Sequence, residues 1–149
     1  MFGGLIDSRE IDYLIGLALA LVCGLLIGAE REHKGKPAGV STQTLVIAGA
    51  MTFSFLSQAL NTGDPTRIAA QIVSGIGFLG AGLIIKSEKN NWVENATTAA
   101  TIWYSAGIGM ALGFRFYLVA VAAAVYAALV ARLPDLPFHA NKRKKHDDV

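Results

Sequence analysis

The stretch RIAAQIVSGIGFLGAGLII, residues 67–85, decides the fold class of this chain because it has the length of a membrane span. A helix rises about 1.5 Å per residue, so about 17–25 apolar residues cross the roughly 30 Å hydrocarbon layer. The stretch nevertheless contains four closely spaced glycines: Gly75, Gly77, Gly80 and Gly82. A glycine inside a helix costs about 1 kcal/mol relative to alanine. The glycines therefore need a physical reason.

The rest of the chain has the same membrane character. Hydrophobic residues make up 53% of it and charged residues 16%, and its mean hydropathy is +0.46, whereas about a quarter of a soluble domain is charged. The charges are clustered and leave long apolar runs between them. We predict an all-α, polytopic membrane helix bundle of about five transmembrane helices, at residues 11–29, 42–60, 67–86, 96–112 and 115–132. These would form one domain, 1–132, followed by a disordered basic cytoplasmic tail, 133–149.

The basic residues predict the orientation of the bundle. With the amino terminus outside, ten of them fall on the inner side: Arg31, Lys34, Lys36, Lys86, Lys89, Arg132, Lys142, Arg143, Lys144 and Lys145. Three fall on the outer side: Arg9, Arg67 and Arg115. Basic residues accumulate in cytoplasmic loops. We therefore expect an external amino terminus and a cytoplasmic carboxy terminus.

The glycines of the opening stretch are interpreted as packing positions. No hydrophobic force draws helices together in lipid, and small residues let their backbones approach closely. Because small residues lie on three sides of this helix, we predict that it is the centre of the bundle. The alternative is a helix broken at its glycines, whose freed backbone groups could bind an ion.

The first span carries a regular ladder of small residues. Four of them are spaced four apart: Gly16, Ala20, Gly24 and Gly28. This small-xxx-small pattern is typical of a closely packed helix pair. The pattern leaves open whether the partner helix belongs to the same chain or to a second copy.

Polar residues near the span ends are candidates for a functional site, since charges in or near a bilayer are retained where they are used. On the inner side these are Glu30, Arg31, Glu94, Asn95, Thr97 and Thr98, and on the outer side Asp64, Arg67, Gln71 and Ser74. Of these, Arg67, Gln71 and Ser74 share one helix face and would form a polar track that runs along the helix from its outer end inward. The alternative is structural, with Asp64 starting the helix and pairing with Arg67. Hydroxyls such as Thr101 and Ser105 would bond to the carbonyl four residues back.

No catalytic or metal-binding motif is found. The phosphate-binding G-x-x-x-x-G-K-[ST], the H-E-x-x-H pair and cysteine pairs are absent from the sequence. A G-x-G-x-x-G match within residues 75–82 follows no strand and lies in an apolar span. We expect no enzymatic activity, no cofactor and no nucleic-acid partner, and the sequence defines no metal ligand set.

Four blocks of the chain resemble the MgtC/SapB family: LLIGAERE (25–32), AGVST (38–42), DPTRIAAQIVSGIGFLGAGLII (64–85) and TTAATIWYSAGIGMALG (97–113). The resemblance implies a protein of the bacterial or archaeal cytoplasmic membrane that is linked to growth at low magnesium. Several members support survival inside macrophages, and the best-known one is held to act on the F-type ATP synthase. Eight polar residues match the motif positions of the family and are carried over as expected site residues: Glu30, Arg31, Asp64, Arg67, Gln71, Ser74, Thr97 and Thr98.

The chain departs from the family pattern at three places. Ser41 replaces the arginine of the block usually written AGLRT, and Asn95 with Ala96 replaces a glycine-leucine pair. Many members also have a soluble carboxy-terminal domain, where this chain has its basic tail. The resemblance therefore implies the membrane domain and gives less support to a virulence-type role.

Three functions follow as hypotheses: a regulator of another membrane complex, a transporter or channel-like unit for magnesium or another small solute, and a purely structural bundle. Magnesium prefers oxygen ligands, commonly one or two carboxylates. Glu30 and Glu94 could supply them, but both lie at inner span ends, and no acid occupies the middle of a span. We therefore rank the regulator first. Expected partners are the lipid bilayer, a second copy of the chain and, from the resemblance, the F-type ATP synthase.

Overall fold

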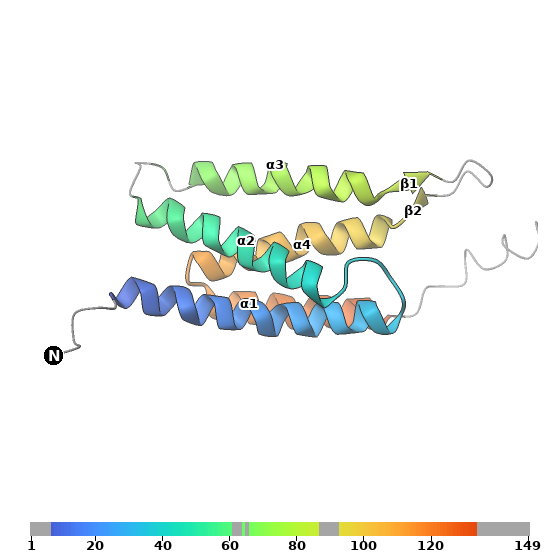
Figure 1. Cartoon of the computed structure of the whole chain (residues 1–149), viewed down its shortest axis with the longest axis horizontal. Helices are drawn as coiled ribbons and strands as arrows, with labels where there is room; N and C mark the ends of the chain where they lie inside the picture. The colour runs from blue at the N-terminus through green and yellow to red at the C-terminus, as the bar shows by residue number, and fades with distance from the viewer. Residues whose placement is uncertain (1–6, 61–63, 65, 87–92, 134–149) are drawn as a thin grey trace, which may run out of the picture.

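The computed structural model describes residues 7–60, 64, 66–86 and 93–133, which fold into five helices and a short hairpin (Figure 1). The helices are α1 (Ser8–His33), α2 (Val40–Ala59), α3 (Thr66–Leu83), α4 (Ala96–Gly113) and α5 (Tyr117–Arg132). The predicted all-α class is confirmed. The strands β1 (Ile85–Lys86) and β2 (Val93–Glu94), which pair antiparallel, were not predicted. The expected tail at 134–149 lies outside the described residues.

Three helices are long and apolar enough to cross a bilayer: α1, α2 and α3. The helix α5 is apolar but shorter, and α4 carries several hydroxyls and glycines that reduce its hydropathy. Large apolar side chains face outward, among them Leu118 (83% exposed) and Leu45 (71% exposed). Such a surface suits lipid. The crossing of the bilayer by α4 and α5 stays a prediction.

Figure 1 shows α3 along one edge of the bundle, α2 and α4 in the middle, and α1 with α5 along the opposite edge. The hydrophobic core lies between α1, α2, α4 and α5. It includes Cys23 and Ile27 of α1, Met51 of α2, Ile108 of α4 and Ala124 of α5. The helix α3 contributes none of the residues of this core.

The small-residue ladder of α1 packs against α2 of the same chain. A Cβ atom added to Gly24 would lie 2.6 Å from the Cα of Thr44, and one added to Gly28 would lie 2.5 Å from the backbone nitrogen of Val40. Gly16 and Ala20 are also buried, and a Cβ added to Gly16 would lie 2.8 Å from the Sδ of Met51 on α2. The ladder is therefore confirmed as a packing surface, with its partner helix inside the chain.

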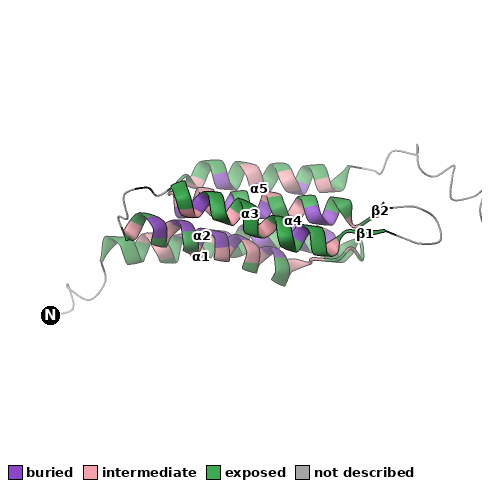
Figure 2. Cartoon of the chain, turned by 90° about the horizontal axis from the view of Figure 1, so that it is seen from above, coloured by how far each residue is buried: buried purple, intermediate pink, exposed green. Residues whose placement is uncertain are grey.

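The prediction that the third span is the central helix is wrong. Its buried residues are Ala69 and Gly80 alone, and most of α3 is exposed (Figure 2). Within the described part of the chain, a Cβ added to Gly75, Gly77 or Gly82 would meet no atom within 4 Å. The reason is geometric: α3 packs mainly against α4 and less closely against α2, so the small residues on its remaining sides meet no described neighbour.

The alternative of a broken third span is also not observed, since α3 is one continuous helix from Thr66 to Leu83. Of its four glycines, Gly80 alone contacts a neighbour, because an added Cβ there would lie 3.7 Å from the Cβ of Ala99 on α4. The packing prediction is therefore confirmed for Gly80 and wrong, within this chain, for the other three.

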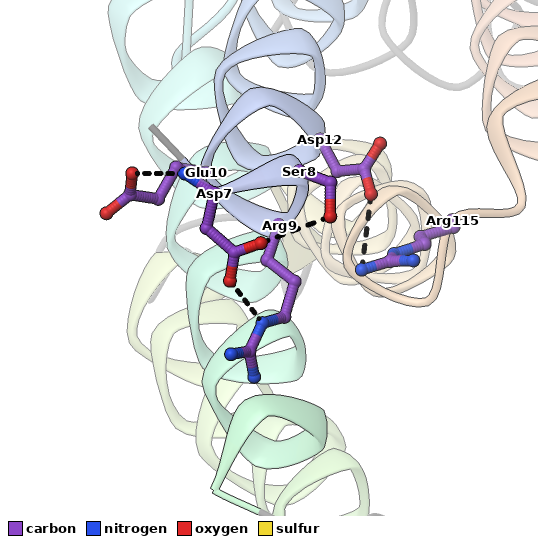
Figure 3. A network of polar contacts seen from close by, with 6 residues as sticks. All are labelled: Asp7, Ser8, Arg9, Glu10, Asp12 and Arg115. Atoms are coloured by element: carbon purple, nitrogen blue, oxygen red, sulfur yellow. Dashed lines mark hydrogen bonds and ion pairs between the residues drawn. The ribbon is translucent and has the colours of Figure 1, made fainter. Parts of the chain in front are cut away.

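A group of polar contacts lies at the end of the bundle where α1 begins (Figure 3). The backbone N–H of Asp7 donates to Glu10 Oε2 at 3.0 Å, as in a capping box. Arg115, in the turn between α4 and α5, forms an ion pair with Asp12 of α1, with 3.2 Å between Arg115 Nη2 and Asp12 Oδ2. This exposed ion pair links the turn to α1, although pairs of this kind contribute little to stability.

Candidate functional site

Some of the predicted polar residues, at the end of α1 and the start of α4, come together around Arg31. This side chain lies in the last turn of α1, is 1% exposed and is the largest fully buried side chain described. Its Nη2 donates to the hydroxyl of Thr98 on α4 and, at 3.4 Å, to the carbonyl of Pro37. Two predicted site residues, 67 positions apart, are thus direct partners.

The segment after α1 folds back to complete this arrangement. Gly35 has a φ of +60°, which allows the chain to turn, and the backbone N–H of Lys36 donates to Arg31 O at 2.9 Å. Glu32 Oε1 then accepts the N–H of Val40 at 2.9 Å, at the start of α2. These contacts place the Pro37 carbonyl beside the guanidinium of Arg31.

Glu30 has a cationic partner. Lys34 Nζ lies 2.6 Å from Glu30 Oε1, one helical turn away. The same Nζ donates to the carbonyl of Ala131 at 2.5 Å and so joins the end of α1 to the end of α5. Glu30 is therefore part of a network that connects helices.

A second buried polar pair lies between α2 and α4, and the sequence reasoning missed Gln43. Gln43 and Ser105 are both 0% exposed, and the Ser105 hydroxyl donates to Gln43 Oε1 at 2.6 Å. Gln43 Nε2 donates to Ala38 O at 3.2 Å. The local bonding predicted for hydroxyls is confirmed at Thr101, which donates to Thr97 O at 2.7 Å, but not at Ser105. The signal that the sequence offered for Gln43 was a glutamine inside an otherwise apolar run.

Removing one partner of the Gln43–Ser105 pair should lower the free energy of unfolding. Ser105→Ala leaves the buried Gln43 carbonyl without a donor, so we expect a loss of about 1–3 kcal/mol of unfolding free energy. The matched control Ser74→Ala removes the same hydroxyl from an exposed position and should stay within about 0.5 kcal/mol. Thermal melts of the detergent-solubilised protein measure both. Equal melting temperatures for the two variants would contradict the assignment.

The polar residues that were predicted for the outer side do not join the residues around Arg31. Asp64 and Arg67 lie at the start of α3, at the end of the bundle opposite to Arg31 (Figure 1). Asp64 Oδ1 accepts the backbone N–H of Thr66 at 2.9 Å, so the predicted helix start is confirmed. Hydrogen bonds from the Thr66 hydroxyl and N–H hold the pKa of the Asp64 carboxyl below its usual value.

The inward polar track predicted on α3 is wrong, because Arg67, Gln71 and Ser74 are all exposed on this edge helix. Among the described residues Arg67 forms no ion pair, so its predicted pairing with Asp64 is not observed. The two buried residues of the helix, Ala69 and Gly80, lie on another face.

Several hollows border the described helices, and two of them lie beside predicted site residues. A groove of about 660 Å³ runs between α2 and α3; its lining is mostly apolar, with Gly49 and Gly75 on its two sides and Gln71 beside them. A smaller pocket of about 240 Å³ lies among the ends of α1, α4 and α5, with Arg31 and Thr97 in its lining. Glu94, in β2, is exposed, and Asn95 precedes α4 with a φ of +62°; neither lines these hollows.

The described residues contain no group of three or more His, Cys, Asp or Glu side chains placed to hold a metal ion. The site around Arg31 offers a guanidinium, ammonium groups and hydroxyls, and its two carboxylates, Glu30 and Glu32, already have partners in Lys34 and the Val40 N–H. Its donors suit an anion or a backbone carbonyl better than a cation.

Comparison with known proteins gives consistent matches. The MgtC family model matches residues 17–135. The chain is 41% identical over 142 residues to Protein MgtC of Salmonella typhimurium, covering 90% of this chain and 61% of the relative. It is 49% identical over 119 residues to Protein MgtC of Brucella abortus (78% and 49%), and 44% identical over 139 residues to an uncharacterized protein of Haemophilus influenzae (84% and 58%). The chain thus spans roughly half to three fifths of these relatives. No solved structure gives a significant match.

Proposed function

This chain belongs to the MgtC family, and we propose that it regulates another membrane complex during adaptation to low magnesium. The membrane would be the bacterial or archaeal cytoplasmic membrane, with the amino terminus outside. The F-type ATP synthase, implied by the family resemblance, is the first partner to test, and a second copy of the chain is the other.

The observation that carries the proposal is the groove between α2 and α3. Its volume is about 660 Å³, and Gly49 and Gly75 in its lining have open space where a Cβ would point. Small residues with open space on an apolar helix surface allow a second helix to approach closely. A transmembrane helix of a partner protein fits this surface.

A transporter receives less support from the same residues. Several polar side chains inside the bundle are paired with one another, as Gln43 is with Ser105 and Tyr13 with Thr52 (3.1 Å between the two oxygens). Some buried hydroxyls, among them that of Ser54, have no hydrogen-bond partner among the described residues. Glu30, a candidate magnesium ligand, is paired with Lys34. A magnesium path would need such oxygens free to replace water around the ion.

Filling the groove should separate function from folding. Gly75→Leu places a bulky side chain in the groove without meeting any described atom near its Cβ, so the protein should melt normally. Capture of the partner should fall about tenfold or more, the equivalent of at least about 1.4 kcal/mol of binding. The measurement is co-purification of ATP synthase subunits with the tagged full chain, beside growth at low magnesium.

The matched control is Gly77→Leu, on the same helix and equally free of neighbours, but outside the groove lining. It should retain both capture and growth. If the Gly75→Leu variant still captures the partner as well as the unaltered protein does, the groove is not the surface that binds the partner. Saturable magnesium flux into liposomes that contain only this protein, abolished by Glu30→Gln, would instead favour the transporter.

A further inference from the structure

The pocket of about 240 Å³ at the inner end of the bundle combines cations with apolar walls. Its polar lining comprises Arg31, Lys36, Thr97, Thr101, Tyr104 and Tyr126. Its apolar lining comes mainly from α5 and includes Ala127, Val130 and Leu133. Two basic groups, four hydroxyl-bearing side chains and no carboxylate therefore line one hollow.

The charge around this pocket is unbalanced in favour of cations. The ends of α1 and α5 and the segment that follows α1 carry four basic residues, Arg31, Lys34, Lys36 and Arg132, against two acids, Glu30 and Glu32. The acids already have partners, because Glu30 pairs with Lys34 and Glu32 accepts the N–H of Val40. Arg31 and Lys36 have no carboxylate partner among the described residues.

Arg31 also retains an unused donor. Its Nη2 is bonded to Thr98 and Pro37, whereas its buried Nε has no hydrogen-bond partner among the described residues. A buried cation without a counter-charge is unfavourable, and an anion nearby would offset that penalty. The structure thus has a positive site that its own acids neutralise only in part, since Glu30 acts on Arg31 but is also paired with Lys34.

The pocket lies where lipid headgroups would be. Arg31 is in the last turn of α1, Thr97 is in the first turn of α4, and Val130 is in the last turn of α5, all at the same end of the bundle (Figure 1). Helix ends of a membrane bundle lie at the interface between headgroups and acyl chains. This is the end that the basic residues place in the cytoplasmic leaflet.

We propose that this pocket binds one phospholipid of the inner leaflet. Lys36 and the hydroxyls of Thr97 and Thr101 would hold the headgroup phosphate, with the buried charge of Arg31 behind them. An acyl chain would follow the apolar residues of α5. A small soluble anion would use the same cations but would gain nothing from the apolar wall, whereas a lipid uses both. The lipid site is independent of the partner proposed above.

The test is lipid binding by the purified full chain in detergent, followed by native mass spectrometry and thermal melts. Phosphatidylglycerol should bind with one molecule retained per chain and should raise Tm, as any ligand of the folded state does. Diacylglycerol lacks the phosphate and glycerol phosphate lacks the chains, so each should bind at least tenfold more weakly. Lys36→Gln should weaken phosphatidylglycerol binding about tenfold, since a charge-assisted hydrogen bond is lost.

Two further variants make the test specific. Ala100→Leu narrows the pocket from an exposed position and should reduce binding. Lys86→Gln removes an exposed charge outside the pocket lining and should leave binding unchanged. Melts without lipid check that each variant is folded.

Three outcomes would overturn the proposal. Binding of glycerol phosphate as tight as that of phosphatidylglycerol would assign the pocket to a soluble anion. Equal binding of diacylglycerol would make it an apolar hollow only. Equal losses for Lys36→Gln and Lys86→Gln would show an unspecific attraction between basic residues and anionic lipid.

Discussion

Gly28→Ala should destabilise the purified protein by about 3 kcal/mol or more, a fall in Tm of about 10 °C. The new methyl group would lie 2.5 Å from the backbone nitrogen of Val40, far inside van der Waals contact. A flexible side chain could turn away, but a backbone atom at the start of α2 moves only if the helices separate. The added helix propensity of alanine, about 1 kcal/mol, does not offset such a clash.

The matched control is Gly75→Ala, the same change on α3. A Cβ there meets no described atom within 4 Å, so alanine should be neutral or should stabilise the helix by up to about 1 kcal/mol. Thermal melts in one detergent compare the two variants directly. If Gly28→Ala melts like the unaltered protein, the close contact between α1 and α2 is not present in solution.

Arg31→Lys should destabilise the protein by about 1.5–3 kcal/mol, the range for a lost hydrogen bond to a charged group. The guanidinium of Arg31 reaches both the Thr98 hydroxyl on α4 and the Pro37 carbonyl from a buried position. An ammonium is a compact point charge without the planar fork that makes such paired contacts. It also requires solvation that this 1% exposed position does not provide.

Arg67→Lys is the control for this change, because Arg67 is exposed at the start of α3. A surface charge accepts lysine within about 0.5 kcal/mol. Thr98→Val tests the same contact from the other side and should lose stability comparably to Arg31→Lys. Equal melting of Arg31→Lys and Arg67→Lys would show that the inner arrangement contributes nothing to stability.

Much of the local structure was predictable from the sequence. The runs predicted at 11–29, 42–60 and 96–112 lie within or close to α1, α2 and α4, because the length of an apolar run and the charges at its ends are local properties. The helix start at Asp64 was also predictable, since a side-chain oxygen capping the first turn needs no distant partner.

The position of α3 could not be predicted in this way. Small residues on three sides identify faces that could pack closely, but they do not say which of those faces another helix covers. The same pattern describes the buried ladder of α1, where Gly28 meets Val40, and the open side of α3, where Gly77 meets nothing described. The inference from small residues to a central helix failed for this reason.

The sequence alone determined the class of this protein, the five helices of its described residues, and the presence of polar residues such as Arg31 and Thr98 at the ends of its spans. The tertiary structure decided which of them meet: Arg31 with Thr98, and Gln43 with Ser105, 62 positions away. It also decided that α3 lies at the edge. The physical reason is that lipid is as apolar as the helix surfaces, so hydrophobicity alone cannot sort the faces of a membrane helix. Their order depends on shape fit and on hydrogen bonds between helices, which exist only once the helices are assembled.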